Sequence, residues 1–555
     1  HTTIDSSMQV AANQALIRGL ESLSLLAGKT RPGFSGLSGR IEAKESGGDV
    51  SLDSRAAVLH FPGVFEDPRI TLERLESQVS WTAKNILTAD GKTTLPSVAL
   101  TIKKLSLANP DTAIEVAGKF DWPGQGAGVA ALDGRVLRAD PTKIHRYVPL
   151  EISADTRTWL KESLLASKPY SASFELHGPL DRFPFRDDPQ SRFLVKAEAE
   201  AGSLRPAPNW PAITNIRANV VFDRQAFRIN ATGAKLNDLS FSAVTGKIDD
   251  VEAARPVLVL DGSLSGDAQR LIDATNRSPL KADLDNVTAD MRARGNVNLA
   301  LALKLDLDDT DRSLVAGKIT LARGSVFRFS DAFPELTVQS AELSFDQDTV
   351  RSLDVQGQSL GGPIRVSNRP VQKGGNDLHV VIDGQATAAG LQQWAEQSLG
   401  VSLKDTMSGM TRYSASVTTK GDLTQARIES SLEGLATNFF GPFKKRARDN
   451  WGLKIDVQRT ASSTPGVYGR ESWVITSNQQ HVNAKINRTL SARGETQIEL
   501  DSRDVAGQFK WIPAQAAAAK SAKSAATPRR AAVLQARLSR LWLEKAKKSD
   551  DTVDV

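Results

Sequence analysis

The sequence predicts a mainly β protein in which a long antiparallel sheet carries a few short helical inserts. Alternation of apolar and polar residues is the first observation, and it is clearest in FLVKAEAE, IRANVVFD, FRINAT and LSFSA between Phe193 and Ala243. Successive side chains of a strand point to opposite faces, so each run builds one apolar and one polar face. The second observation is that short polar connections join these runs. Together they predict an antiparallel meander whose apolar face has to be covered by something.

Composition limits the class of protein. The chain has 555 residues, of which 40% are hydrophobic and 24% charged, as in globular proteins. Its 70 basic and 64 acidic residues alternate in sign instead of forming the basic stripe of a nucleic-acid-binding protein. The absence of cysteine excludes disulfides and thiolate chemistry, and it fits the bacterial periplasm or the cytoplasm. No run of about 18 apolar residues predicts a membrane-spanning helix. The sequence starts at His1 without an initiator methionine and ends in KAKKSDDTVDV, so we expect a piece of a longer protein whose membrane anchor, if it has one, lies outside this piece.

The pattern along the chain predicts many consecutive strands with a few helices between them. Separate β-sandwiches would restart about every 100 residues, so a sheet that keeps adding hairpins fits better. Leucines at helical spacing mark the N-terminal segment, and Trp159 with Leu160, Leu164 and Leu165 marks a helical face further on. We expect a helical segment at 1–30, helical inserts at 142–167, 266–280 and 387–408, β segments at 31–141, 168–265, 281–386 and 409–513, and a low-complexity linker with a truncated C-terminal part at 514–555.

The apolar positions of the strands are the candidate binding residues. From periodicity alone, these faces can either close on one another as a dry sandwich core or hold a ligand. The candidates are Phe193, Val195, Ile216, Ala218, Val220, Phe222, Phe227, Ile229, Leu239, Phe241, Ile319, Leu321, Leu343, Phe345, Val380 and Ile382.

Motifs of catalysis and metal binding are weak. DLDDTD at 306–311 suggests calcium, but the sixth and twelfth positions of an EF-hand loop would be Asp311 and Gly317, so a solvated turn fits better. GQGAG at 124–128 reads as a loop, and the six histidines are scattered. KKRAR at 444–448 reads as a solvated loop or as a contact for anionic lipid heads. We expect no enzyme activity, no metal and no cofactor.

Ordered phrases resemble the YhdP proteins of Gram-negative bacteria, which belong to the AsmA-like superfamily with TamB as a relative. They are FSGLSGRIEAKESGGDVSLDS, HFPGVFEDPRITLERLESQVSWT, RYVPLEISADTRTWLKESLLASKPYSASFELHGPLDRFPF, PNWPAITNIRANVVFDRQAFRI and LDVQGQSLGGPIRVS. The resemblance runs from about 34 to about 450. FFGPFKKRA at 439–447 departs from it, because a phrase richer in proline and leucine is expected before the lysine.

The resemblance implies a bridge-type lipid transfer protein in the periplasm, tethered to the inner membrane by a helix outside this fragment. Its fold would be a twisted antiparallel β-sheet curled into an open, taco-like hydrophobic groove. Phospholipids would pass along the groove between inner and outer membrane, which maintains outer-membrane lipid homeostasis and the permeability barrier. The implied partners are phospholipids, the inner membrane and further envelope proteins, with no nucleic acid.

Alternatives remain at this point. An envelope scaffold would instead act on outer-membrane proteins by β-strand augmentation. A glycan-processing enzyme would need clustered carboxylates in a cleft, whereas the acidic residues here lie mostly at polar strand positions. Trp159 and Trp394 can anchor ordinary core packing, or their helices can line the groove and gate lipid entry.

Overall fold

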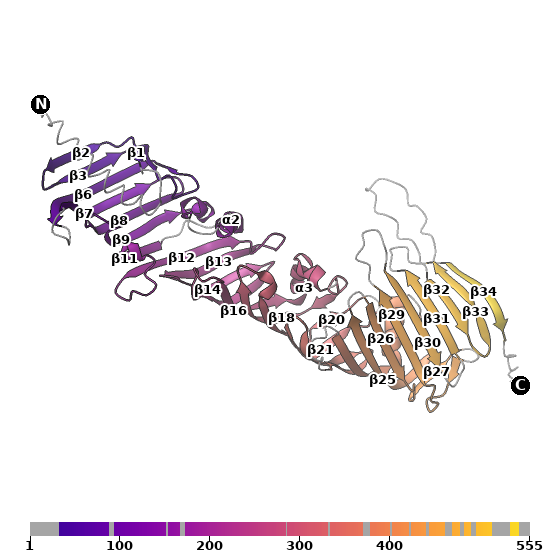
Figure 1. Ribbon diagram of the computed structural model, residues 1–555. Helices are drawn as coiled ribbons and strands as arrows, with labels where there is room; N and C mark the ends of the chain where they lie inside the picture. The colour runs from indigo at the N-terminus through magenta and orange to yellow at the C-terminus, as the bar shows by residue number, and fades with distance from the viewer. Residues whose placement is uncertain are drawn as a thin grey trace, which may run out of the picture. The chain divides into compact units, whose positions relative to one another are not determined.

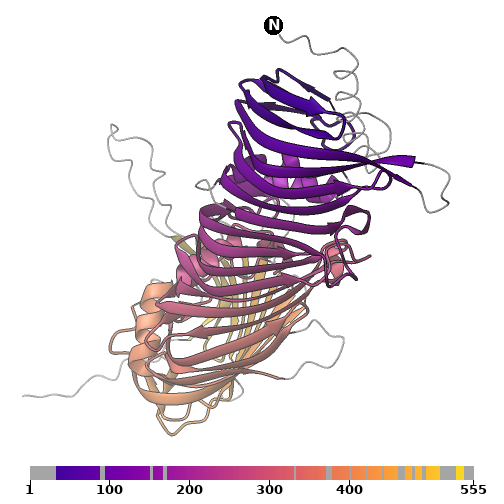
Figure 2. The ribbon, with the colours of Figure 1, turned by 90° about the vertical axis from the view of Figure 1, so that its left-hand side faces the viewer.

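The computed structural model confirms the predicted fold class: within the residues that it describes, thirty-one strands belong to one antiparallel sheet, and the helices are few and short. The chain forms two compact units, of which the first holds 1–265 and 300–315 and the second holds 266–299 and 316–555. Figure 1 shows the elements in chain order, and Figure 2 shows how the strands curve. The structure describes residues 33–87, 94–150, 154–166, 172–284, 286–330, 333–369, 378–399, 402–420, 423–439, 443–460, 469–477, 482–489, 496–512 and 533–542.

Unit 1 is a meander with one small side sheet. Its main strands are β2 (Gly39–Lys44), β3 (Gly47–Ser54), β6 (Arg74–Leu87), β7 (Thr94–Ala108), β8 (Thr112–Trp122), β9 (Val129–Ala139), β10 (Leu164–Ala166), β11 (Ala172–Pro179), β12 (Arg192–Leu204), β13 (Ile213–Asp223), β14 (Ala226–Leu236), β15 (Leu239–Ile248) and β16 (Val257–Asp267). The side sheet holds β1 (Gly33–Ser35), β4 (Ala57–His60) and β5 (Arg69–Leu72). The helices are η1 (Pro141–Tyr147), α2 (Ala154–Ser163) and η2 (Leu180–Arg182).

Unit 2 is also built from antiparallel strands. The division between the units falls within β18 (Asn296–Asp306), and η3 (Thr310–Arg312) belongs to unit 1. The strands of unit 2 are β17 (Arg292–Arg294), β19 (Leu314–Leu321), β20 (Val326–Arg328), β21 (Leu336–Asp346), β22 (Val350–Ser359), β23 (Gly362–Asn368), β24 (Leu378–Thr387), β25 (Met407–Lys420), β26 (Leu423–Ser430), β27 (Leu435–Asn438), β28 (Lys444–Lys445), β29 (Leu453–Thr460), β30 (Arg470–Ser477), β31 (Val482–Thr489), β32 (Thr496–Asp501), β33 (Val505–Ile512) and β34 (Val533–Leu541). The helices are α3 (Ala268–Asn276), α4 (Leu280–Asp283), α5 (Ala388–Trp394) and η4 (Ala395–Leu399).

The four runs that dominate the sequence form β12 to β15, each paired antiparallel with the next. β-Bulges interrupt the alternation, because an extra residue shifts the side-chain parity of the strand. Ala243 shows this: it adopts a left-handed φ of 47° where the register between β15 and β16 shifts, and its side chain is exposed. Parity therefore assigns faces reliably only between bulges.

The helical inserts follow the sequence in part. α3 begins after Asp267, whose carboxylate accepts hydrogen bonds from two backbone N–H groups of the first turn, and α5 begins after Thr387, whose hydroxyl does the same once. The predicted helical face at 142–167 is wrong for Leu164 and Leu165, because these residues form β10 and pair with the end of β12. The segment 1–30 and the linker at 514–532 lie outside the described residues, whereas β34 shows that the last predicted segment also holds a strand.

Candidate functional site

Unit 1 carries an apolar face that is in register from strand to strand. Pairing places one residue of each strand directly opposite the next, and the resulting unit 1 row is apolar throughout. It consists of Leu75, Leu107, Ile114, Val136, Ala172, Ala197, Val220, Ile229, Gly246 and Leu260 on β6 to β9 and β11 to β16. A second row runs beside it, where Phe174, Val195, Phe222 and Phe227 face one another. Side chains in direct register are neighbours on one face, so the rows form one surface.

Unit 2 has a longer apolar face built in the same way. The unit 2 row runs through thirteen strands from β19 to β34 without a polar side chain. It consists of Leu321, Ala341, Val355, Val366, Ile382, Ala415, Ile428, Ile455, Ile475, Ala484, Leu500, Gly507 and Leu538. The opposite face is polar, as the neighbouring row Gln356, Arg365, Asp383, Ser414, Glu429 and Lys454 shows.

The apolar faces are mostly half-buried. Val220 and Ile229 in unit 1, and Val355, Ile382 and Ile455 in unit 2, all have intermediate exposure. In a dry sandwich core such side chains would be fully buried, because interiors are packed to the density of organic crystals. The fully buried apolar residues of the rows are small or peripheral, such as Leu75 in unit 1 and Ala415 and Ala484 in unit 2. Each face therefore keeps apolar surface that can contact a ligand.

The sixteen candidate residues lie on seven strands of the two units. β12, β13, β14 and β15 carry the first ten, and β19, β21 and β24 carry the other six. The register brings Val195, Phe222 and Phe227 together, and Val220 faces Ile229. Leu239 differs, because it has no exposed surface and so offers nothing to a ligand. That the other fifteen line a lipid groove stays a prediction.

An ion pair shows that the sheet of unit 2 is curled. The Nη2 atom of Arg459 on β29 lies 3.1 Å from a carboxylate oxygen of Asp290, which precedes β17 by only two residues. Eight strand pairings separate β17 from β29, which would place them about 38 Å apart on a flat sheet. Two residues of chain and two side chains reach roughly 20 Å at most. The sheet therefore bends round between these strands.

The direction of the curl follows from which face makes the contacts. Arg459 has the same strand parity as Ile455 and Val457, so it belongs to the apolar face. Helix α3 also packs on this face, because its Leu271 and Ile272 pack with Ile319 and Leu321 around a cluster of buried residues. Both ends of the segment formed by 268–291 thus contact the apolar side. We conclude that the apolar face is the concave face of unit 2.

Helix α3 covers part of the predicted lining. Ile319 and Leu321 are partly buried against Ala268, Ala293 and Val297, and Phe327 completes the cluster. These two candidates therefore pack in an ordinary small core at one edge of unit 2. Leu343, the register partner of Ile319, has intermediate exposure.

An aromatic ladder lies at one margin of the apolar face of unit 1. The ring of Phe183, from the connection between β11 and β12, stands 4.9 Å from that of Phe193, and Phe193 stands 5.7 Å from Phe222. These edge-on contacts are the favoured geometry for aromatic pairs. Phe183 is 49% exposed, whereas its neighbour Phe185 is completely buried and anchors the connection. The ladder extends the apolar face beyond the strands themselves.

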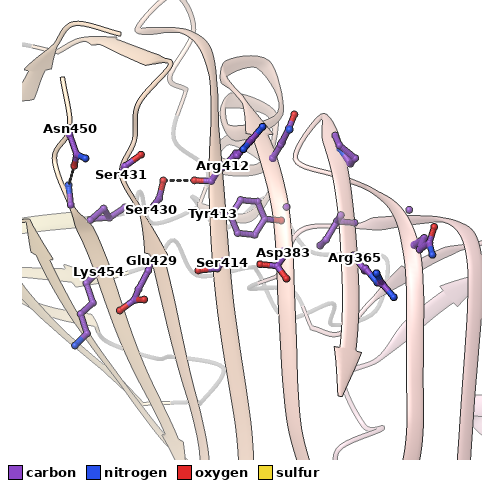
Figure 3. Close-up of a pocket in the computed structure, with 18 of the residues that line it drawn as sticks. Arg365, Asp383, Arg412, Tyr413, Ser414, Glu429, Ser430, Ser431, Asn450 and Lys454 are labelled. Atoms are coloured by element: carbon purple, nitrogen blue, oxygen red, sulfur yellow. Dashed lines mark hydrogen bonds between the residues drawn. The ribbon is translucent and has the colours of Figure 1, made fainter. Parts of the chain in front are cut away.

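A hollow of about 980 Å³ lies in unit 2, but its side chains belong largely to the polar face. Figure 3 shows Arg365, Asp383, Ser414 and Glu429 side by side along neighbouring strands. Tyr413 alternates with Arg412 and Ser414 along β25, and burial raises the pKa of its hydroxyl to about 12. The charged side chains of the lining have both signs, and Ile364, Tyr413 and Leu453 also line the hollow, so it is not a purely apolar lipid site.

Several expectations about polar motifs can be compared with the structure. Asp306 caps its own turn, because one carboxylate oxygen accepts hydrogen bonds from the backbone N–H groups of Asp308 and Asp309. Among the described residues, no cluster of three histidine or acidic side chains could hold a metal ion. The solvated-loop reading of 444–448 is wrong for Lys445: it is 2% exposed, its ammonium donates to the backbone carbonyls of Leu435 and Arg446, and burial lowers its pKa.

The two tryptophans of the helical inserts have different environments. Trp159 on α2 is 44% exposed and donates to the carbonyl of Pro206 at 3.0 Å, so its interpretation as a core anchor is wrong. Trp394 at the end of α5 is partly buried. None of the described helices is long and apolar enough to cross a lipid bilayer.

Sequence reasoning missed much of the face that the register assembles. Leu107, Ile114 and Val136 precede the stretch from which most candidates came, and Ile428 and Ile455 follow it. The alternation is visible in KLSLAN, TAIEVAG, GRVLRA, ARIESS and GLKIDVQ, so the same period-two signal could have found these residues. No local pattern could have found the ion pair between Arg459 and Asp290, which are 169 residues apart.

A long antiparallel sheet with one apolar and one polar face, curled toward the apolar side in unit 2, defines a class of one-sided β-groove proteins. The comparisons with known proteins specify the family. A family model described as YhdP protein matches residues 2–550, and the chain belongs to this family. The intermembrane phospholipid transporter YhdP of Escherichia coli K12 is 19% identical over 470 residues, which is 83% of this chain. The chain spans about a third (35%) of that relative's length. No solved structure matches this chain.

Proposed function

We propose that this chain binds phospholipids on the apolar faces of its sheet and passes them along from strand to strand. The observation that carries the proposal is the unit 2 row, in which thirteen strands present apolar residues in register on one face, and most of these residues keep exposed surface. Acyl chains are interchangeable apolar ligands, so a site for them needs continuous apolar surface and no catalytic group. The charged headgroup then lies at the hydrated margin of the face.

The energetics explain why such a face is needed. A phospholipid that leaves a bilayer exposes two chains of roughly 16 carbons, at a free-energy cost of about 20–25 kcal/mol when each CH₂ contributes about 0.8 kcal/mol. A half-buried apolar face removes part of this cost on one side of the chains, and the curl covers them further. A row without polar interruptions keeps the cost even from one strand to the next, which permits movement along the row.

The relative supports the finer part of the proposal. It is an intermembrane phospholipid transporter, and 83% of this chain is aligned with it. We propose that the chain does the same as part of a longer protein anchored in the inner membrane. Lipids would then cross the periplasm along the groove toward the outer membrane, where they maintain lipid composition and the permeability barrier.

The test is to purify the chain without detergent and to identify bound molecules by mass spectrometry. We expect co-purified phospholipid that survives washing with buffer and is released by organic solvent. A preparation that is folded but free of lipid, and that takes up none from vesicles, would contradict the proposal. Crosslinking that captures outer-membrane proteins and no lipid would instead support the envelope scaffold that acts by strand augmentation.

A further inference from the structure

A charged row borders the apolar face of unit 2. Arg459 on β29, Glu471 on β30 and Arg488 on β31 lie directly opposite one another in register. Two residues further along the same strands, the register partners are apolar: Val457, Trp473 and Ile486. Because residues two apart share a face, the three charged side chains stand on the apolar side of the sheet, at its margin.

The centre of this row is held in place. Glu471 is 7% exposed, and one of its carboxylate oxygens accepts a hydrogen bond from the indole N–H of Trp473 at 2.8 Å. The contact fixes the tryptophan between the apolar and the charged row. A tryptophan in this position has its ring against apolar groups and its N–H toward polar ones, as at the interface of a lipid bilayer.

The two arginines differ in their partners. The side chain of Arg459 is 32% exposed, and its guanidinium lies 3.1 Å from a carboxylate oxygen of Asp290, at the point where the segment 268–291 approaches β29. Arg488 is exposed and makes no ion pair within the part of the chain that the structure describes. Two strand spacings place the arginines about 10 Å apart. Arg459 thus already holds an anionic oxygen at the concave side, and Arg488 offers a second guanidinium beside it.

We propose that Arg459 and Arg488 bind the phosphodiester of a phospholipid headgroup while its acyl chains lie along Val457, Trp473 and Ile486. The inference rests on the proposed function and adds a headgroup site to the apolar face. Guanidinium groups suit this ligand, because their planar donor pairs match phosphate oxygens. Asp290 pairs with Arg459 in this structure, and the arriving phosphodiester displaces its carboxylate.

A headgroup site at Arg459 and an ion pair that only stabilises the curl predict different effects of substitutions. Replacing Asp290 with Asn removes the competing carboxylate, so phospholipid binding becomes tighter. If the pair only fastens the curl, the same change loosens the groove and leaves binding unchanged or weaker. Arg488→Ala removes an exposed side chain that fastens nothing, and it weakens phospholipid binding. Arg470→Ala is the matched control, because Arg470 is an exposed residue of opposite parity on the neighbouring strand β30.

The experiment titrates the purified chain with two fluorescent lipids of identical acyl chains, phosphatidylglycerol and diacylglycerol, which lacks the phosphate. For a charge pair at a solvated margin we expect about a two- to fivefold loss of phosphatidylglycerol affinity with Arg488→Ala, a gain of similar size with Asp290→Asn, and weakening of both effects at high salt. Diacylglycerol binding and the Arg470→Ala variant should match the unchanged chain. Melting curves verify that each variant is folded.

Two results would overturn the headgroup site: equal effects of Arg488→Ala on both lipids, or no gain from Asp290→Asn. Inorganic phosphate separates the two sources of a phosphate group, since a site for the free ion would bind it by calorimetry with an affinity that matches the lipid's. That result would also overturn the headgroup assignment. If neither lipid binds the unchanged chain, it is the proposed function that fails.

Discussion

A single charge on the apolar face separates a lipid-carrying groove from a closed core. Val220 on β13 and Ile229 on β14 are register partners in the unit 1 row, and both are half-buried. Asn219 and Asn230 are also register partners, on the same two strands, but they are exposed on the polar face. Val220→Asp and Asn219→Asp therefore add the same charge one residue apart on opposite faces of one strand.

The expected loss of stability is small. Full burial of a valine side chain contributes about 1.5–3 kcal/mol, so a half-buried one contributes about 1 kcal/mol. A loss of that size lowers the melting temperature by about 2–4 °C in a unit of this size. Water hydrates the new carboxylate when the groove is empty. Once acyl chains cover it, desolvation of the carboxylate costs several kcal/mol, and about 3 kcal/mol already lowers lipid affinity roughly a hundredfold.

The assay combines thermal melting with transfer of a fluorescent phospholipid between two vesicle populations. We expect Val220→Asp to melt within a few degrees of the unchanged chain and to lose most of its transfer, whereas Asn219→Asp keeps both. Global unfolding of Val220→Asp would show that the face is the interior of a tightly packed core. Normal transfer by a folded Val220→Asp variant would show that lipids do not use this face. Either result would contradict lipid binding on this face.

Three further predictions test the geometry. Because the sequence has no cysteine, a cysteine pair can be introduced at Asp290 and Arg459, and a short bis-maleimide should join the two within one chain. A control pair at Asp290 and Gln458, which lies on the other face, should not be joined. Equal crosslinking yields for the two pairs would contradict the curl. Burial raises the pKa of Tyr413 to about 12, so the folded chain keeps the hydroxyl proton above pH 10, where the unfolded chain loses it. The free energy of unfolding should therefore fall by about 2–3 kcal/mol as the pH rises toward 12. In the Tyr413→Phe variant this fall should be smaller. The hydrogen bond from Arg427 lowers the pKa of Asp456 below its usual 3.8. The ionised carboxylate therefore stabilises the fold above pH 3.8, and this contribution should be lost as the pH falls through the lower pKa of the folded chain. Acid denaturation of the Asp456→Asn variant should lack this loss of stability.

The fold could be predicted because its main signal is local. Alternation with period two is a property of each strand, and short polar turns force neighbouring strands to pair, as β12 to β15 do. The apolar candidates on these strands share a face for the same reason. Bulges could not be placed from sequence, because Ala243 looks like any other apolar position until the register shifts around it.

The rest depends on distant contacts. Leu164 and Leu165 fit a helical face as well as a strand, and only pairing of Leu164 with Leu204 decides for the strand. Lys445 looks solvated within a basic run, yet its ammonium is enclosed by backbone carbonyls that the chain brings together. The curl of unit 2 rests on Asp290 meeting Arg459 across eight strand pairings, and no composition or spacing encodes that meeting.

Site-specific photo-crosslinking can show directly whether lipids lie on the apolar face of unit 2. A photoreactive amino acid is placed at Ile382 on the apolar face of β24, or at the adjacent Asp383 on its polar face, and the folded chain is irradiated with phospholipid vesicles. We expect lipid adducts at Ile382 and at its unit 2 row partner Ile455, and none at Asp383. Adducts of equal yield on both faces, or none at Ile382 and Ile455, would contradict this expectation.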